Sequence, residues 1–426
     1  MKKELVVLVL ILLVSAGIVS ACSGWGFFKK NSALISEIVQ EFEKEGKVKV
    51  VEKRFEDKYL LVEIKYIDNL NEPPITVDFL LNIKEKPKKI IYLLPGSALN
   101  FKSNFFTPRD YNLAKYLADS KYLVIGITPR EDLAIPVNNY EYMKNWGLEK
   151  HTEDVRKIIS LVESVLPKKY EILGHSLGGI IALDYAAKYS SVDKKLKRVI
   201  VLDMVGEYEN ETLRQYAQIS YDALKSLWQQ GYYADESMAD SKKLILMAKI
   251  FPTADSGFPR SLIAGDPTLE GNFTLKGLVY YMLIHTNKVP GVLTPITGLP
   301  DNWHFKQGFC SGEYKFDPEN PENDTYELYL TNYSTIQEAT IKIRSGVYPT
   351  AVMLDVYKCW SGNSSINWTK ISVPVLWINC ELGFDKEFLP KEIQEKLDVK
   401  FLVIPGYGHA DIVYAENATD VWQNLI

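Results

Sequence analysis

The sequence predicts an α/β protein with a mostly parallel sheet that is covered by helices on both faces. Short, continuous apolar segments alternate with amphipathic segments over residues 89–203, and the same alternation resumes after residue 371. Continuous apolar strands are typical of parallel sheets buried on both faces, with helices as the connections between strands. We therefore expect a single α/β core that is interrupted by a long segment, residues 206–370.

The individual elements follow from hydrophobic spacing and turn residues. Apolar positions three and four residues apart predict a first helix, residues 32–45, followed by three strands separated by polar turns. The alternation of strands and helices then begins. Strands are expected at 47–51, 60–66, 76–81, 89–94, 122–127, 170–173, 199–203, 373–379 and 399–405, and core helices at 110–120, 151–166, 180–189 and 418–425.

The interrupting segment differs from the core in composition. It is rich in Tyr, Trp, Gly and Pro, and it contains helical patterns at 212–228 and 242–251. The expected organisation is a signal peptide, a tether with an N-terminal helix, the first part of the core, the insertion and the second part of the core, at residues 1–22, 23–46, 47–205, 206–370 and 371–426.

Composition excludes several classes of protein. The 426 residues include 49 basic and 54 acidic side chains, a net charge of −5, which argues against a nucleic-acid partner. Hydrophobic residues make up 46% of the chain, as in a globular protein. Four cysteines are too few for a disulfide scaffold, and no CxxC or HExxH pair indicates a metal site. We expect neither a metal nor an organic cofactor.

The amino terminus has the parts of an export signal. Met1-Lys2-Lys3 precedes an apolar run and then small residues, and the run is too short to span a membrane comfortably. The segment that ends at Cys22 resembles a lipobox, in which the cysteine is lipidated and anchors the protein to the membrane. The alternatives are simple secretion, with cleavage near Ala21, and an uncleaved anchor. All three place the folded part outside the cytoplasm, and we expect a lipid-anchored protein at the cell surface.

Two further features are compatible with an extracytoplasmic protein. Cys310 and Cys359 could pair in an oxidising compartment. Asn-X-Ser/Thr sequons, which are potential glycosylation sites, occur at Asn210, Asn272, Asn323, Asn332, Asn363, Asn367 and Asn417.

A candidate nucleophile lies between a predicted strand and a predicted helix. The segment 174–179 reads Gly-His-Ser-Leu-Gly-Gly and places Ser176 at the turn. Glycines on both sides let the strand and the helix approach closely, and the turn exposes the serine hydroxyl. The amide of Leu177, at the start of the helix, points toward an oxyanion that forms at this serine.

This segment resembles the nucleophile elbow of the α/β-hydrolase superfamily, in a form common among lipases, esterases and thioesterases. The resemblance covers residues 48–203 and 371–426, and not the insertion. It implies an α/β-hydrolase fold, in which the insertion, entering after the sixth strand, would be a cap over the active site. It also implies a serine nucleophile activated by a histidine and a carboxylate.

The resemblance places the histidine in a loop after the last strand, and His409 lies in such a loop. The acid usually follows the penultimate strand, but Gly383 occupies the position where it is expected. We expect Asp385 to be the acid, with Glu381 and Asp203 as alternatives. The second oxyanion donor is expected from the loop after the strand 89–94, as the amide of Ser97 or Ala98.

The expected function is hydrolysis of carboxylic esters, either small molecules or lipids, with apolar acyl groups. Aromatic residues of the insertion could line the substrate site or could form the insertion's own core; they are Phe251, Phe258, Phe273, Tyr280, Tyr281, Trp303, Phe305 and Phe309. The alternatives are an amide, peptide or thioester hydrolase with the same triad, and a non-catalytic surface binding protein on a hydrolase core.

Overall fold

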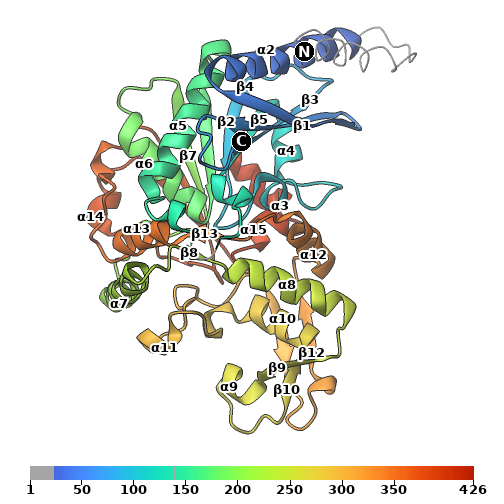
Figure 1. The fold of residues 1–426 in the computed structure, drawn as a ribbon, viewed down its shortest axis with the longest axis vertical. Helices are drawn as coiled ribbons and strands as arrows, with labels where there is room; N and C mark the ends of the chain where they lie inside the picture. Colours follow the sequence, from blue (N-terminus) through green and yellow to red (C-terminus); the bar gives the residue numbers. More distant parts are fainter. Residues whose placement is uncertain (1–23, 138–139) are drawn as a thin grey trace.

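The structure, a computed structural model, describes residues 24–137 and 140–426, and a nine-stranded sheet forms its centre (Figure 1). The strand order is β1-β2-β3-β5-β4-β6-β7-β14-β15. The first three strands are antiparallel, β3 is antiparallel to β5, and the six strands from β5 to β15 are parallel. Their bounds are β1 Lys47–Glu56, β2 Tyr59–Ile67, β3 Ile75–Asn82, β4 Lys89–Leu94, β5 Tyr122–Thr128, β6 Tyr170–His175, β7 Leu196–Leu202, β14 Val375–Cys380 and β15 Val399–Ile404.

The strands separate two hydrophobic cores because successive side chains point to opposite faces of a sheet. In β5, Leu123 and Ile125 belong to one core, whereas Tyr122 and Val124 belong to the other. Every residue of β5 is buried, as expected for a central strand with helices on both sides.

Helices cover both faces of the sheet (Figure 1). Side chains of α2 (Gly24–Glu45), α5 (Leu148–Val165) and α6 (Leu177–Tyr189) belong to the first core. The second core includes side chains from α3 Phe101–Asn104, α4 Leu113–Asp119, α15 Asp411–Tyr414 and α16 Thr419–Trp422. Ile393 of the short helix α14 (Lys391–Gln394) packs against the first core.

The insertion connects β7 to β14 and lies beyond the carboxyl ends of the parallel strands, at the lower end of the view in Figure 1. Among the described residues, none of its strands joins the nine-stranded sheet. Its three small sheets pair β8 with β13, β9 with β10 and β11 with β12. Its elements are α7 Glu211–Gln229, β8 Ala234–Asp235, α8 Ser237–Ile250, β9 Asp255–Pro259, α9 Arg260–Ala264, β10 Asn272–Thr274, α10 Leu275–Ile284, α11 Thr294–Thr297, β11 Gly312–Lys315, β12 Thr325–Leu328, α12 Tyr333–Lys342, β13 Tyr348–Pro349 and α13 Thr350–Trp360.

The sequence-based expectations agree with this sheet, and all nine expected strands are present. The helix α2 begins at Gly24, so residues 24–31, which were expected to be a tether, are helical. Counted along the chain, the insertion follows the seventh strand, β7, and not the sixth as expected, because the edge strand β1 adds one strand to the count.

The insertion is attached to the core by ion pairs at the end of α12. The guanidinium of Arg344 lies 2.7 Å from a carboxylate oxygen of Glu63 in β2 and 2.9 Å from one of Asp132. Both carboxylates are almost fully buried. Lys342 donates hydrogen bonds to the carbonyl oxygen of Phe106 and to the hydroxyl of Thr107. This side of the insertion is therefore held firmly against the core.

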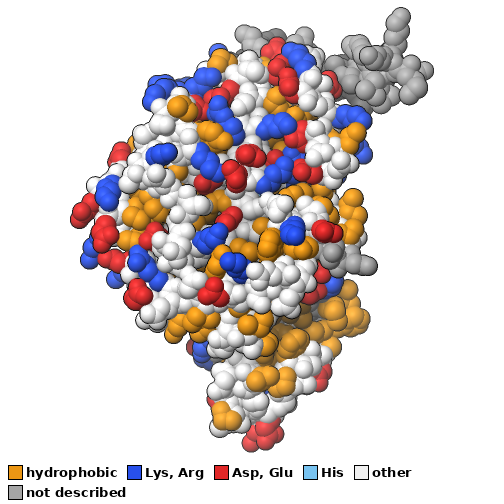
Figure 2. Space-filling view, turned by 60° about the vertical axis from the view of Figure 1, so that its left-hand side comes forward, with side chains coloured by type: hydrophobic (Ala, Val, Ile, Leu, Met, Phe, Trp, Pro, Cys, Tyr) orange, Lys and Arg blue, Asp and Glu red, His pale blue; other side chains and the backbone are white. Residues whose placement is uncertain are grey.

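Other expectations concern the surface and the amino terminus. The signal segment and Cys22 lie outside the described residues. Within the residues that the structure describes, no helix is long and apolar enough to span a bilayer. Cys310 and Cys359 are free thiols in different hydrophobic cores, so the structure does not join them in the suggested disulfide. On the face in Figure 2, acidic and basic side chains are interspersed over the core.

Candidate active site

The turn between β6 and α6 has the geometry of a nucleophile elbow. Ser176 has φ 55° and ψ −126°, a backbone conformation that non-glycine residues rarely adopt. A Cβ atom on Gly174 would lie 2.0 Å from the carbonyl oxygen of Gly178, and one on Gly178 would lie 2.1 Å from that of Leu94. Glycine is therefore required on both sides of the serine, and the side chain of Ser176 is only partly buried.

The imidazole of His409 is held by a buried carboxylate, that of Asp203. His409 lies in the loop between β15 and α15, and its Nδ1 atom is 2.6 Å from Oδ2 of Asp203. Asp203 follows β7 directly and has no exposed surface. Its other oxygen, Oδ1, accepts hydrogen bonds from the amides of Cys380, at 2.7 Å, and Phe384, at 3.3 Å. These contacts orient the carboxylate toward the histidine.

This geometry corrects the choice of Asp385 as the partner of His409. Oδ2 of Asp385 accepts instead from Nζ of Lys306, at 2.9 Å, in a partly exposed ion pair. Glu381 accepts from the amide of Gly406 and lies 3.8 Å from the same lysine. Of the three carboxylates considered from the sequence, only Asp203 bonds to His409 among the described residues.

Four rings surround the imidazole of His409. The ring of His175 stacks on it, with centroids 4.7 Å apart, and Phe305 lies at 4.9 Å. Phe309 and Phe384 lie at 5.7 Å. Because Phe305 and Phe309 belong to the insertion, the insertion forms part of the apolar wall around this histidine.

The insertion also supports the loop that carries His409. The amide of His409 donates to the carbonyl of Gly308, and the amide of Ala410 donates to the carbonyl of Phe309. The buried carboxylate of Asp411 accepts from the amide of Ser311 at 2.7 Å. Burial raises the pKa of Asp411 to about 6, despite the hydrogen bonds that it accepts. The histidine loop and the insertion are thus packed as one unit.

The loop after β4 lies beside Ser176, as expected for an oxyanion loop. A Cβ atom on Gly96 would lie 3.2 Å from Cβ of Ser176. The amide of Gly96 donates to Oδ1 of Asn104 at 2.8 Å, so it is already bonded. The next amides along the loop are those of Ser97 and Ala98, and Leu177 is the first residue of α6, where the amide has no acceptor within the helix. These amides stay our candidates for oxyanion donors.

The aromatic residues of the insertion divide into two groups. Phe305 and Phe309 contact His409, and Trp303 packs against His304 and Trp360. The others lie away from the histidine: Phe251 and Phe258 are exposed, Phe273 and Tyr281 form the insertion's own core, and Tyr280 stacks on Tyr326 and Tyr333.

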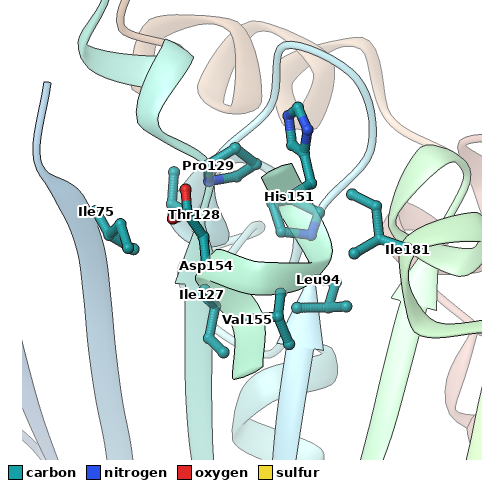
Figure 3. Close-up of a pocket in the computed structure, with 10 residues that line it drawn as sticks. Ile75, Leu94, Ile127, Thr128, Pro129, His151, Asp154, Val155 and Ile181 are labelled. Carbon is teal, nitrogen blue, oxygen red and sulfur yellow. The ribbon is translucent and has the colours of Figure 1, made fainter. Parts of the chain in front are cut away.

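A small internal cavity lies near the ends of β4 and β5, between these strands and α5 (Figure 3). The side chain of His151 lines it, and both ring nitrogens have partners: Nε2 lies 3.0 Å from Glu131 and Nδ1 lies 2.7 Å from the carbonyl of Gly147. No cluster of potential metal ligands occurs in the described part of the chain.

Sequence reasoning missed two polar residues beside the site. Asn104 carried no recognisable signal, because its role depends on the loop that folds over it. His175 lies within the motif around Ser176, but nothing in the sequence indicates that its ring stacks on that of His409. From the sequence, Asp203 is only an alternative candidate for the acid. Gly383, which stands where the acid is expected, is the signal that favours a carboxylate from another loop.

Comparison with known proteins identifies the fold. No protein-family model and no curated protein matches the chain. Among solved structures, a candidate lipase from Sulfolobus solfataricus is 16% identical, with a TM-score of 0.55 over 89% of this chain and 98% of that one. A carboxyl esterase from Bacillus coagulans is 14% identical, with a TM-score of 0.43 over 86% and 95% of the two chains. On the first of these similarities and the topology of its sheet, this chain has the α/β-hydrolase fold.

Proposed function

We propose that this protein is a serine hydrolase that cleaves carboxylic esters, with Ser176 as nucleophile, His409 as general base and acid, and Asp203 as the orienting carboxylate. The observation that carries the proposal is the 2.6 Å hydrogen bond between the buried carboxylate of Asp203 and Nδ1 of His409. The ring of His409 also stacks on His175, the residue directly before Ser176 on the strained turn. A histidine that is oriented by a carboxylate near a serine of this kind fits the arrangement that activates a hydroxyl for acyl transfer.

The reaction follows from these roles. As Oγ of Ser176 attacks the acyl carbon, its proton passes to Nε2 of His409, and the amides of Leu177 and Ser97 stabilise the oxyanion. The intermediate collapses, and His409 protonates the departing alcohol. Water then attacks the acyl-enzyme, giving its proton to His409, which returns it to Ser176 as the carboxylic acid is released.

An apolar substrate is favoured by the rings around His409. Phe305, Phe309 and Phe384 present hydrocarbon surface next to the reacting histidine. Transfer of an apolar acyl or alcohol group from water to such a surface is favourable. The solved structure described as a candidate lipase is consistent with this substrate class.

Labelling with a fluorophosphonate probe tests the mechanism. We expect the wild-type protein to be labelled on Ser176, as identified by peptide mass spectrometry, and Ser176→Ala to be unlabelled. His409→Ala should lose labelling because the hydroxyl lacks its base. Labelling of Ser176 that persists in His409→Ala would contradict the mechanism.

The substrate class requires a matched panel of esters, thioesters and anilides with acyl chains of increasing length. We expect the highest kcat/KM for medium-chain esters, because each added methylene is worth about 0.8 kcal/mol on burial. A preference for anilides would favour an amidase, a preference for thioesters a thioesterase, and no turnover by labelled protein a binding role.

We further propose that the protein acts outside the cytoplasm, anchored to the membrane through Cys22. The N-terminal sequence supports this location, and six of the seven sequon asparagines are exposed, Asn272 being partly buried. In cells fed an alkyne-tagged fatty acid, the wild type should incorporate the tag and Cys22→Ser should not. Equal labelling of both proteins, or a mature N-terminus other than Cys22, would exclude this anchor.

A further inference from the structure

A chain of buried hydrogen bonds begins at the backbone of His409 and leads away from Asp203. Nε2 of His175 lies 3.0 Å from the carbonyl oxygen of His409. A carbonyl only accepts, so Nε2 carries a hydrogen and donates it. His175 is 2% exposed, and its ring is inclined at 29° to that of His409.

The opposite nitrogen of His175 is an acceptor. Burial and the neighbouring His409 lower the pKa of His175 to about 3, so the ring is neutral and Nδ1 has a free lone pair. Nδ1 lies 3.1 Å from Nδ2 and 3.2 Å from Oδ1 of Asn104. Only the nitrogen can donate. The Nδ2 group of Asn104 therefore bonds to His175.

The amide group of Asn104 has one orientation that satisfies all its neighbours. Its Oδ1 accepts from the backbone N–H of Gly96 at 2.8 Å, which leaves Nδ2 for His175. The phenol of Tyr414 donates to the carbonyl oxygen of Ser103, the residue before Asn104, at 2.8 Å. The direction of donation thus runs from Gly96 to Asn104, to His175 and to the carbonyl of His409.

We propose that Asn104 and His175 are positioning residues that set the oxyanion loop and the histidine loop relative to Ser176. This relay joins residues 96 and 409, which lie in the loops after β4 and β15, to residue 104 at the end of α3 and residue 175 at the end of β6. The inference rests on the proposed ester hydrolase and adds two residues to its machinery, neither of which contacts the substrate.

Each end of the relay has a defined effect. At one end, Asn104 binds the amide of Gly96 and so leaves the next amide, that of Ser97, to serve the oxyanion. At the other end, His175 fixes the backbone of His409, whose imidazole is fixed by Asp203. Because His175 stays neutral, it does not compete for the proton of Ser176. A displacement of about 1 Å in such groups can cost about 100-fold in rate.

Three substitutions at position 175 separate the interactions. His175→Phe keeps a ring against His409 and removes both hydrogen bonds. His175→Gln can keep the donor to the carbonyl of His409, and His175→Asn can keep a polar group near Nδ1. With a soluble short-chain nitrophenyl ester, we expect His175→Phe and Asn104→Leu to lower kcat by about 10- to 100-fold, with KM changed by less than about threefold. His175→Gln should restore much of this loss.

The relay also predicts how the substitutions combine. If both residues act through one chain of bonds, Asn104→Leu with His175→Phe should be little worse than the more impaired single variant. His285→Phe, a histidine substitution in the insertion at the end of α10, is the matched control and should keep wild-type kcat. Wild-type kcat in folded Asn104→Leu and His175→Phe would overturn the proposal.

Histidine nitrogen NMR of the full-length protein tests the relay without any turnover. In the wild type, His175 should stay neutral between pH 5 and pH 8, with its hydrogen on Nε2, and Asn104→Leu should shift its Nδ1 resonance. A His175 that titrates in this range, or that carries its hydrogen on Nδ1, would overturn the relay. Absence of both labelling and hydrolysis in the wild type would instead refute the proposed function, and the NMR result would then decide the relay alone.

Discussion

Asp203 occupies the space that a side chain at Gly383 would need. A Cβ atom on Gly383 would lie 2.1 Å from Oδ2 of Asp203, the oxygen that bonds to His409. The loop after β14 is the usual source of the acid in the fold that the sequence resembles. Here the carboxylate that bonds to His409 comes from the end of the neighbouring strand, β7, and the loop contributes a glycine that makes room for it.

The identity of the acid is tested by two amide substitutions. Asp203→Asn should lower kcat by about 10⁴-fold, because an amide no longer favours the imidazole tautomer and the imidazolium that catalysis needs. Asp385→Asn breaks only a partly exposed ion pair with Lys306 and should change kcat by less than about twofold. Steady-state kinetics on one ester would decide. The reverse order of effects would restore Asp385 as the acid.

Substitution of Gly383 should lower activity because a side chain at this position would displace the carboxylate of Asp203. Gly383→Ala forces its methyl group against the carboxylate of Asp203, so the carboxylate must turn away from His409. We expect kcat to fall by about 100-fold, with circular dichroism unchanged. Asp385→Ala, two residues away, is the control. Full activity in Gly383→Ala would show that the carboxylate can shift without cost.

The buried ion pair of His151 and Glu131 predicts a dependence of stability on pH. Burial alone would lower the pKa of His151, but the Glu131 carboxylate and the Gly147 carbonyl raise it from 6.5 to about 9. Because the pKa of His151 is higher in the folded state than in the unfolded state, the charged pair stabilises the folded protein fully below pH 6.5. This stabilisation is lost as the pH rises through 9.

The shift corresponds to up to about 3 kcal/mol of unfolding free energy. Urea unfolding should therefore show a steeper loss of stability between pH 6.5 and pH 9 in the wild type than in His151→Gln. His285→Gln, which lacks such a partner carboxylate, should keep the wild-type slope. Equal slopes in the wild type and His151→Gln would contradict the charged pair.

The attachment of the insertion to the core is tested at Arg344. Arg344→Met would remove the cationic partner of the buried carboxylate of Asp132, whereas Glu63 would keep its ion pair with Lys102. Removing one partner of a buried ion pair typically costs about 3 to 5 kcal/mol. The free energy of unfolding in urea should fall by about this amount. The exposed pair of Lys243 and Asp240 is the comparison, and Lys243→Met should change stability by less than about 0.5 kcal/mol. Equal effects of the two substitutions would mean that the ion pairs of Arg344 do not stabilise the packing of the insertion against the core.

Much of the fold could be predicted because its signals are local. A continuous apolar run such as β5 is buried wherever it lies, and the glycines around Ser176 report a close approach of strand and helix. The order of elements along the chain placed His409 in the loop after the last strand, where the structure has it. The extent of α2 was underestimated because its first residues include Gly24 and Gly26, and glycine has a low helix propensity.

By itself, the sequence determined the class of fold, the nucleophile elbow and the loop that carries the histidine, since each depends on residues that are neighbours along the chain. Only the tertiary structure decided which carboxylate binds His409 and which residues bind its backbone. Asp203 is 206 residues from His409, and His175 is 234 residues from it. Bonds over such separations depend on how β6, β7 and the loops beyond them pack, because directional hydrogen bonds require positions accurate to a few tenths of an ångström.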